Sequence, residues 1–160
     1  GEDTLLGGDG DDLLLLADTA VLQVDGGGGF DCLGLLGEDL PLDLTDSALA
    51  DRFSGIEMID MRGSGDNSLS LDGDAVLQIS DLLSDGADTA GLLFVLGDLP
   101  MTEPEGGTNI AREGDEVLLA GAWSLQSDQS DGSYYAYELS GVDITLMIQS
   151  ELRVVLSEVA

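Results

Sequence analysis

The sequence predicts an all-β protein: a right-handed parallel β-roll or β-helix with short helices and a C-terminal antiparallel cap. Two observations predict this fold. Glycine-aspartate nonapeptides occupy the N-terminus, and short apolar runs separated by turn residues occupy the rest of the 160 residues. The chain is 43% hydrophobic but only 4% aromatic, so its core is built from Leu, Val and Ile, which suits thin repeated layers. We expect one structural domain with nonapeptide repeats over 1–34, a β-helix continuation over 35–98 and an antiparallel capping unit over 108–160.

The nonapeptide repeats are the strongest signal. Gly7–Leu15 matches the pattern G-G-x-G-x-D-x-U-x, where U is a large apolar residue, and Gly1–Leu6 matches the last six positions of the same unit directly before it. Gly26–Gly34 matches the pattern again, and Arg62–Ser70 is a weaker echo with Arg for the first Gly and Asn for the Asp. The aspartates of the two full matches lie 19 positions apart, one more than two repeats. Their turns are therefore expected to stack on the same edge of a two-sided roll.

The residue types of the repeat suit calcium. Glycine adopts backbone angles closed to other residues and leaves main-chain carbonyls exposed on the turn, while Asp adds an anionic oxygen. Calcium takes about six to eight oxygens in irregular geometry, which two stacked turns can supply. Asp12 and Asp31 are the predicted ligand pair, and Asp3 is expected to pair with Asp18 one coil later. The other candidate site residues lie on the turns: Gly8, Gly10, Gly27, Gly29, and Asp9, which is expected to point outward and to enrich the local field. Glycine-rich turns with no bound ion are the alternative interpretation.

Short apolar runs after the repeats predict further strands. The helical spacing of Ser47–Phe53 and Asp74–Leu83 predicts two helices, with Asp72 or Asp74 capping the second. Leu99–Gly107 contains prolines and glycines and is expected to be an exposed loop. The expected strands in this middle part are Ala20–Val24, Cys32–Leu36, Leu40–Leu44, Ile56–Met61, Ser68–Leu71 and Leu92–Leu96. The triplets 42–44, 59–61 and 69–71 share an apolar-polar-apolar form, which suggests successive rungs of a parallel coil.

The final third alternates apolar and polar residues and predicts antiparallel strands that cap the open end of the coil. Ser140-Gly141 lies between two alternating runs and indicates a hairpin. Trp123 and the three tyrosines lie close together in the sequence, and we expect them to pack across strands rather than to form a sugar- or peptide-binding platform. The expected strands are Val117–Leu119, Trp123–Leu125, Tyr134–Leu139, Val142–Ile148 and Leu152–Leu156.

The charge balance narrows the function. The chain has 33 acidic and 4 basic residues, a formal net charge of −29. Such a chain repels itself unless cations are present, and it has no basic patch for nucleic acid or anionic lipid. An acidic surface that only maintains solubility is the simpler interpretation, but calcium neutralisation better explains aspartates in ordered Gly-Asp contexts.

The missing residue types exclude several kinds of site. Histidine is absent and Cys32 is the only cysteine, which excludes zinc sites of Cys and His, Ser-His-Asp and Cys-His catalysis, and a disulfide within the chain. Cys32 is expected to be an inert thiol in a strand. No stretch reaches the ~20 apolar residues of a membrane span. We therefore expect no enzyme activity and no membrane insertion.

The repeats resemble the calcium-binding regions of repeats-in-toxin proteins, specifically those in large bacterial adhesins exported by type I secretion. The chain after the nonapeptides carries a more specific resemblance, because it looks like the module that ends a repeat tract in such adhesins. The segments that resemble this module are 24–31, 42–45, 55–61, 63–71, 74–81 and 114–123. Only about three units remain of the long arrays usual in the family, and Phe30 and Cys32 stand where polar residues are usual.

The resemblance implies a non-catalytic, calcium-dependent structural module of a secreted cell-surface adhesin. Its partners would be calcium ions and neighbouring modules of the same long chain or like subunits. The acidic chain would stay unfolded where calcium is scarce and fold on binding calcium outside the cell. The alternatives are a subunit of a self-assembling extracellular fibre or surface layer, and an accessory module of a secreted enzyme.

Overall fold

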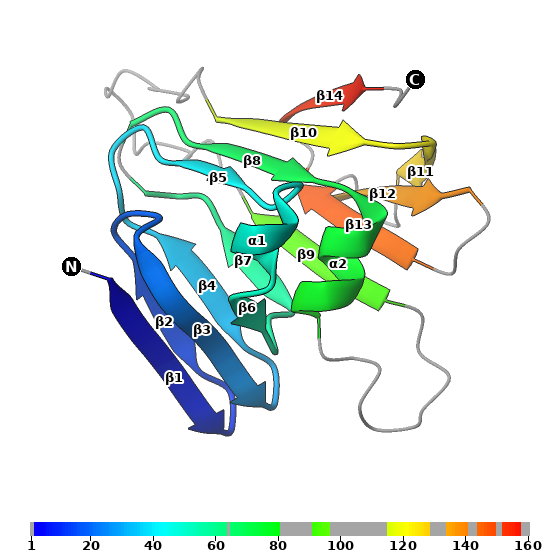
Figure 1. Cartoon of the computed structure of the whole chain (residues 1–160). Coiled ribbons are helices and arrows are strands. Elements are labelled where there is room, and N and C mark those ends of the chain that lie inside the picture. Colours follow the sequence, from blue (N-terminus) through cyan, green and yellow to red (C-terminus); the bar gives the residue numbers. More distant parts are fainter. Residues whose placement is uncertain are drawn as a thin grey trace, which may run out of the picture.

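A computed structural model of the chain describes residues 2–63, 65–80, 91–96, 115–128, 134–140, 144–149 and 152–157. These residues form strands and only two short helices, so the protein is all-β as predicted (Figure 1). The strands are β1 (Asp3–Asp9), β2 (Leu13–Leu16), β3 (Val21–Gly28), β4 (Cys32–Leu35), β5 (Pro41–Asp43), β6 (Phe53–Ser54), β7 (Met58–Asp60), β8 (Ser68–Leu71), β9 (Gly91–Leu96), β10 (Glu116–Ala120), β11 (Trp123–Asp128), β12 (Tyr134–Leu139), β13 (Ile144–Gln149) and β14 (Arg153–Ser157), and the helices are α1 (Ser47–Ala50) and α2 (Gly73–Ile79).

The strands form three sheets. The orders are β1-β3-β6, β14-β10-β8-β5 and β11-β12-β13-β9-β7-β4-β2. The first two sheets are parallel throughout. The third is parallel from β2 to β13 and becomes antiparallel only at β12 and β11. The architecture is therefore mixed, and none of the sheets closes on itself within the described ranges.

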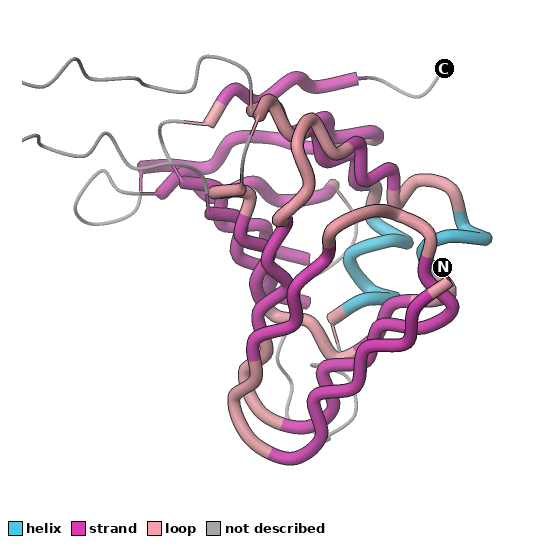
Figure 2. Tube along the Cα trace, turned by 90° about the vertical axis from the view of Figure 1, so that its left-hand side faces the viewer, coloured by secondary structure: helices cyan, strands magenta, loops and turns pink. Residues whose placement is uncertain are grey.

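The chain visits the sheets in turn. It passes from β1 to β2, then through β3, β4 and β5, then through β6, β7 and β8, and each strand lies beside its predecessor in the same sheet. Figure 2 shows the first two passes edge-on as two layers joined by turns at the bottom of the view. Equivalent positions of successive passes therefore stack directly on one another.

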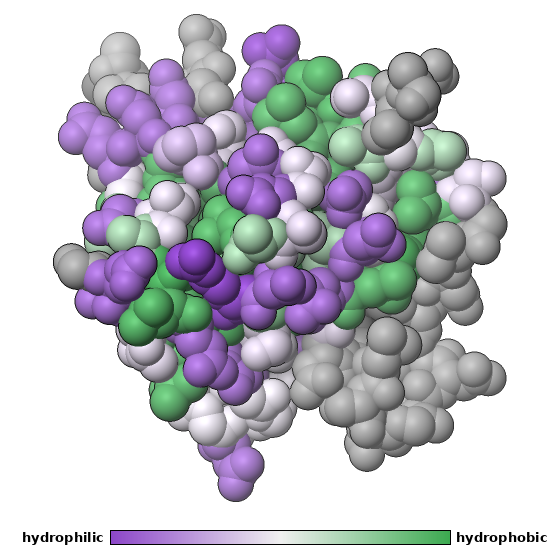
Figure 3. Space-filling view, in the orientation of Figure 1, coloured by the Kyte–Doolittle hydropathy of each residue, from purple (hydrophilic) through white to green (hydrophobic). Residues whose placement is uncertain are grey.

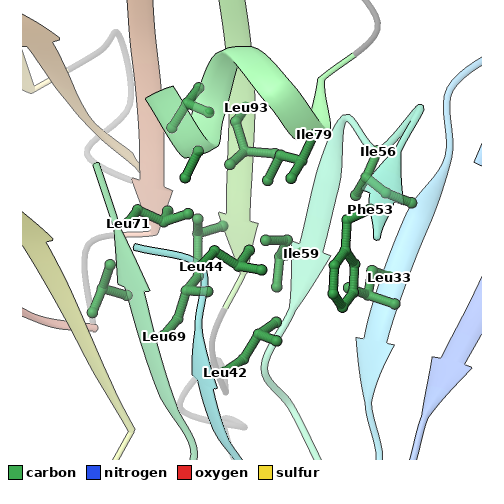
Figure 4. Packing of buried hydrophobic residues seen from close by; sticks show 14 of the residues in the cluster. Leu33, Leu42, Leu44, Phe53, Ile56, Ile59, Leu69, Leu71, Ile79 and Leu93 are labelled. Atoms are coloured by element: carbon green, nitrogen blue, oxygen red, sulfur yellow. The ribbon is translucent and has the colours of Figure 1, made fainter. Parts of the chain in front are cut away.

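The core consists of rows of apolar side chains aligned across the strands. One row runs through Leu14, Leu33, Ile59, Val95 and Ile148, which are paired from strand to strand and all buried. The side chains of the different sheets meet in the middle (Figure 4). Each fully buried Leu or Ile contributes about 1.5–3 kcal/mol, so the alternation of apolar and polar residues fixes which face of each strand points inward.

The two helices are shorter than predicted and cover the core beside the sheets (Figure 1). Asp72 caps α2, as predicted, because its side chain accepts a hydrogen bond from the Ala75 N–H. Val76 and Ile79 point into the core. The helix ends at Ser80, which has extended backbone angles, and its hydroxyl donates to the Val76 carbonyl. The end predicted at Leu83 and the predicted loop Leu99–Gly107 lie outside the described residues.

The C-terminal third differs from the prediction of an antiparallel cap over 108–160. β10 lies parallel between β8 and β14, and β13 is parallel to β9, so only the β11–β12 and β12–β13 pairs are antiparallel. The second of these pairs flanks the predicted Ser140-Gly141 turn, of which Gly141 lies outside the described residues. A period-2 pattern gives the buried face of a strand but not its direction, which explains the error. The local pattern also does not determine which sheet a strand joins. The triplet 59–61 lies in a different sheet from 42–44 and 69–71, which are direct neighbours.

The aromatic cluster packs within the sheet rather than lining a surface platform. Trp123 and Tyr137 are buried, and the Trp123 indole N–H donates to the Ala120 carbonyl at 3.1 Å. Leu125 is paired with Tyr137 across β11 and β12. These contacts agree with the predicted cross-strand packing.

Candidate metal centre

Two glycine-rich turns lie one above the other at the ends of β1 and β3. The strands are parallel, with Gly8 opposite Gly27 and Asp9 opposite Gly28. The Gly10 N–H donates to the Gly28 carbonyl at 2.7 Å, which continues the ladder beyond the strand ends. The turns 7–12 and 26–31 are thus in register along their whole length, as the sequence spacing predicts.

Four of the predicted site residues shape these turns. The backbone φ angles of Gly8, Gly10, Gly27 and Gly29 are 111°, 113°, 98° and 142°. Residues other than glycine rarely adopt such φ angles, so the turns require glycine at these positions. Cβ atoms added to Gly27 and Gly29 would clash with the carbonyl oxygens of Gly8 and Gly10, respectively, so the stacked turns also lack room for side chains.

Asp12 and Asp31, the predicted ligand pair, lie in one column inside these turns. The Asp12 N–H donates to Asp31 Oδ1 at 2.8 Å, and Asp31 is fully buried. The second carboxylate oxygens, Asp12 Oδ2 and Asp31 Oδ2, are buried and have no hydrogen-bond partner among the described residues. Two neighbouring carboxylates thus each have a buried oxygen without a partner among the described residues.

A carbonyl oxygen lies next to the unpaired oxygen of Asp12. A Cβ atom on Gly7 would lie 2.9 Å from Asp12 Oδ2 and would clash with the Gly26 carbonyl oxygen. The two oxygens therefore converge beside Gly7, and neither has a proton to share with the other when the carboxylate is ionised. A cation that contacts both oxygens would offset the charge of the carboxylate.

Glu57 is a third member of the column, and the repeat motif does not include it. The Asp31 N–H donates to Glu57 Oε2 at 2.8 Å, and the Glu57 side chain is buried. We call Asp12, Asp31 and Glu57 the acidic column. Glu57 follows the single Gly55 and lies within an apolar run, so no repeat pattern marks it. The only sequence signal is a carboxylate inside a predicted strand.

The arginines in the described part of the chain have partners outside the acidic column. Arg52 donates to the Val21 carbonyl, Arg62 pairs with Asp60 at 2.6 Å and Arg153 pairs with Glu116 at 3.0 Å, which engages every arginine in the described part of the chain at another place. An ionised carboxylate buried without a partner costs several kcal/mol, so such groups pair, protonate or bind a metal.

The remaining predicted acids lie on the surface. Asp3 and Asp18 are exposed, and Asp18 Oδ1 accepts from the Ala20 N–H at 2.8 Å, which closes its own turn. Because both side chains are exposed, the predicted pair of Asp3 and Asp18 would offer an ion no buried carboxylate oxygen. Asp9 is exposed as predicted, and Asp11 Oδ1 accepts from the Phe30 N–H.

A second corner column shows the same hydrogen-bond pattern with an amide in it. The Leu40 N–H donates to Asn67 Oδ1 at 2.8 Å, and the Asn67 N–H donates to Asp115 Oδ1 at 2.7 Å. Asn67 Nδ2 donates to the Met61 carbonyl at 3.2 Å. We call Leu40, Asn67 and Asp115 the amide column. Here the side chain supplies its own proton to a carbonyl, which is what the Asp oxygens of the acidic column cannot do.

The residues present fit a hard divalent cation that is held partly by backbone. No three Asp, Glu or Cys side chains gather into one group within the described ranges. The oxygens around Gly7 and Gly26 come instead from single carboxylates and from carbonyls of glycine turns. Calcium accepts such mixed and irregular oxygen sets, whereas magnesium requires near-octahedral geometry.

Cys32 directly follows Asp31 at the start of β4 and is half-buried, and its N–H donates to the Asp12 carbonyl at 2.9 Å. Burial raises the pKa of the Cys32 thiol to about 11, and the Asp60 carboxylate adds to the rise. Burial also acts to raise the pKa of Asp60, but hydrogen bonds from Arg62 hold it below its usual value. Asp60 therefore stays ionised and disfavours the thiolate of Cys32.

Alkylation of Cys32 should be slow in the folded protein. With its pKa raised from 9.0 to about 11, the thiolate fraction at a given pH below 9 falls about a hundredfold, and the native rate with iodoacetamide should fall at least as far below that of the urea-unfolded chain. Asp60→Asn should speed the native reaction because it removes the charge that opposes the thiolate. Equal rates in folded and unfolded protein would contradict this assignment.

Comparison of the chain with protein-family models, curated proteins and solved structures finds no match. In the described ranges, no helix has the length and apolar character needed to cross a membrane.

Proposed function

We propose that this chain is a non-catalytic, calcium-binding structural module of a secreted bacterial cell-surface adhesin. The observation that carries the proposal is the buried Asp12 Oδ2, which has no hydrogen-bond partner among the described residues and lies near the Gly26 carbonyl oxygen. The register of the two turns supports it, because the glycines required for the turns also bring these oxygens together.

The fold that accompanies this function is a parallel β-roll at the N-terminus that continues as a β-helix. The regular passage from sheet to sheet and the aligned core rows support this description. We expect right-handed coils, since connections between parallel strands of one sheet are right-handed in about 98% of cases.

The residues have separate tasks in this proposal. Asp12 Oδ2 and the Gly26 carbonyl oxygen would hold the ion, and Asp31 Oδ1 holds the first turn in place through the Asp12 N–H. Calcium would supply the positive charge that the turns lack. Because the unfolded chain has no such site, the binding free energy adds to the stability of the folded state.

The charge of the chain supports a location outside the cell. At −29 the chain resists compaction where calcium is scarce, and calcium outside the cell would relieve that repulsion. Folding would then follow export, as the resemblance to type I-secreted adhesins implies. Calcium would then act both as a ligand and as the signal that the chain has left the cell.

The N-terminal end of the sheets supports a neighbouring module as partner. β1 and β2 are the terminal strands of their sheets, and Leu6 and Leu13 are 64% and 63% exposed. Figure 3 shows apolar surface over this region, broken by hydrophilic side chains. A preceding coil of the same long protein would cover it. A like subunit there would instead make the chain a unit of a fibre, which calcium-dependent light scattering would reveal.

Isothermal titration calorimetry with calcium tests the proposal. Asp12→Asn should weaken the binding of the ion between the two turns at least about tenfold, because it removes the anionic oxygen beside the Gly26 carbonyl. Asp9→Asn is the matched control from the same turn, and its exposed carboxylate should change the affinity by less than about twofold. If the wild-type chain releases no binding heat with calcium and retains its fold in chelator, the proposal fails.

A further inference from the structure

The second glycine turn repeats the geometry of the first against a loop that lacks the repeat motif. A Cβ atom on Gly26 would lie 2.7 Å from Asp31 Oδ2 and would clash with the Gly55 carbonyl oxygen. The corresponding atoms one coil earlier are Gly7, Asp12 Oδ2 and the Gly26 carbonyl oxygen. The convergence of a carboxylate and a carbonyl therefore occurs twice, with a shift of one coil.

The unpaired oxygen of Asp31 is more deeply enclosed than that of Asp12. The Asp31 side chain is fully buried, its Oδ1 is occupied by the Asp12 N–H, and its Oδ2 has no hydrogen-bond partner within the described ranges. That oxygen lies on the side of Gly26, toward the Gly55 carbonyl. Water cannot easily satisfy a fully buried group, so the unpaired Asp31 Oδ2 is more costly than the unpaired oxygen of the half-buried Asp12.

The loop that contains Gly55 is fixed on the second turn from both directions. The Asp31 N–H donates to Glu57 Oε2 at 2.8 Å, while the Glu57 and Met58 N–H groups both donate to the Asp31 carbonyl at 3.1 Å. Gly55 has a φ of 62°, which a side chain would disfavour. The position of the Gly55 carbonyl is thus determined by bonded neighbours rather than by chance proximity.

The amide column has a side-chain donor, Asn67, at the place where the acidic column has Asp31. A Cβ atom on Gly63 would clash with the Leu35 carbonyl oxygen, and the nearest side-chain atom is Asn67 Nδ2 at 3.2 Å. Nδ2 is a donor and binds the Met61 carbonyl. The Asn67 amide thus supplies a proton to a carbonyl, which the ionised carboxylate of Asp31 cannot do, and a buried carboxylate without a donor favours a bound cation.

We infer that a second divalent cation binds between the turn 26–31 and the loop 55–57, with Asp31 Oδ2 and the Gly55 carbonyl oxygen as ligands. The inference rests on the proposed calcium function and extends it to a loop that the repeat pattern does not mark. The oxygen-only ligand set with a backbone carbonyl selects calcium over magnesium and over softer metals. Glu57 adds negative charge beside the ion and ends the acidic column.

Native mass spectrometry counts the ions directly. The wild-type chain in calcium should carry two tightly bound ions, and Asp12→Asn should carry one, because the variant removes the first position alone. The Asp12→Asn, Asp31→Asn double variant should carry none. An Asn at either position is expected to donate to the adjacent carbonyl as Asn67 does, so the variants should stay folded, which circular dichroism checks.

The outcomes separate this inference from the proposed function. One ion on the wild-type chain and none on Asp12→Asn would overturn the second site and leave the proposed function standing. One ion on both, lost only when Asp31 is changed, would support the site described here and overturn the assignment to Asp12. No ion on the wild-type chain would overturn both.

Discussion

Removing calcium should lower the melting temperature of this protein by roughly 5–11 °C for each site that is saturated. An ion present at about 100 times its dissociation constant stabilises the folded state by about 2.7 kcal/mol. In a domain of about 150–250 residues, each kcal/mol shifts the melting temperature by about 2–4 °C. The loss should be larger still at low ionic strength, because 33 acidic residues then repel one another without screening.

Circular dichroism in calcium and then in excess chelator measures this shift. The double variant Asp12→Asn, Asp31→Asn is the control, and its melting temperature should be nearly the same in both solutions because its turns no longer need a cation. Magnesium in place of calcium should restore little of the wild-type stability. A wild-type melting temperature that does not change with chelator would refute calcium-dependent folding.

Replacing Phe53 by Ala should cost about 3–5 kcal/mol of folding free energy, the usual range for removing a buried aromatic ring. Phe53 is 1% exposed on β6 and lies with Leu33 and Ile56 in the core (Figure 4). Its strand pairs with β3 through Val24 opposite Phe53. The short strand and its ring therefore connect two of the three sheets.

Urea denaturation in saturating calcium measures the cost. Phe30→Ala is the matched control, because Phe30 is 42% exposed and its ring packs on Phe94, with ring centroids 6.1 Å apart. Its removal should cost less than about 1.5 kcal/mol. Similar losses for the two variants would mean that the core does not depend on Phe53 in the way its burial indicates.

Much of the fold can be predicted from local patterns in the sequence. The strands Ser68–Leu71 and Tyr134–Leu139 have the predicted limits, because alternation marks the buried face of a strand. β1 is longer than the three-residue x-U-x segment of the repeat, and it includes glycine and aspartate, which are poor strand formers. It forms because the turns 7–12 and 26–31 align it with β3, a contact between distant residues that no local pattern contains.

The candidate site likewise contains residues that the sequence motif predicts and residues that it does not. The motif predicts Asp12 and Asp31, since glycines at fixed spacing make the turns that enclose them. It does not predict Glu57 or Gly55, because their place in the column depends on which loop the chain happens to stack on the second turn. The parallel direction of β10 and β14 is equally invisible to a period-2 pattern.

The hydrogen bonds of the acidic column all run in one direction along the chain, so its two ends expose different groups. Every donor in it belongs to the earlier coil and every acceptor to the later one, from Asp12 to Asp31 and from Asp31 to Glu57. Within the column, deleting the first coil would free Asp31 Oδ1, an acceptor that solvent or a cation can satisfy. Deleting the third would strand the Asp31 N–H in the interior, at a cost of about 1–3 kcal/mol. Within this column, an end on the N-terminal side therefore exposes acceptors, whereas an end on the C-terminal side exposes a buried donor.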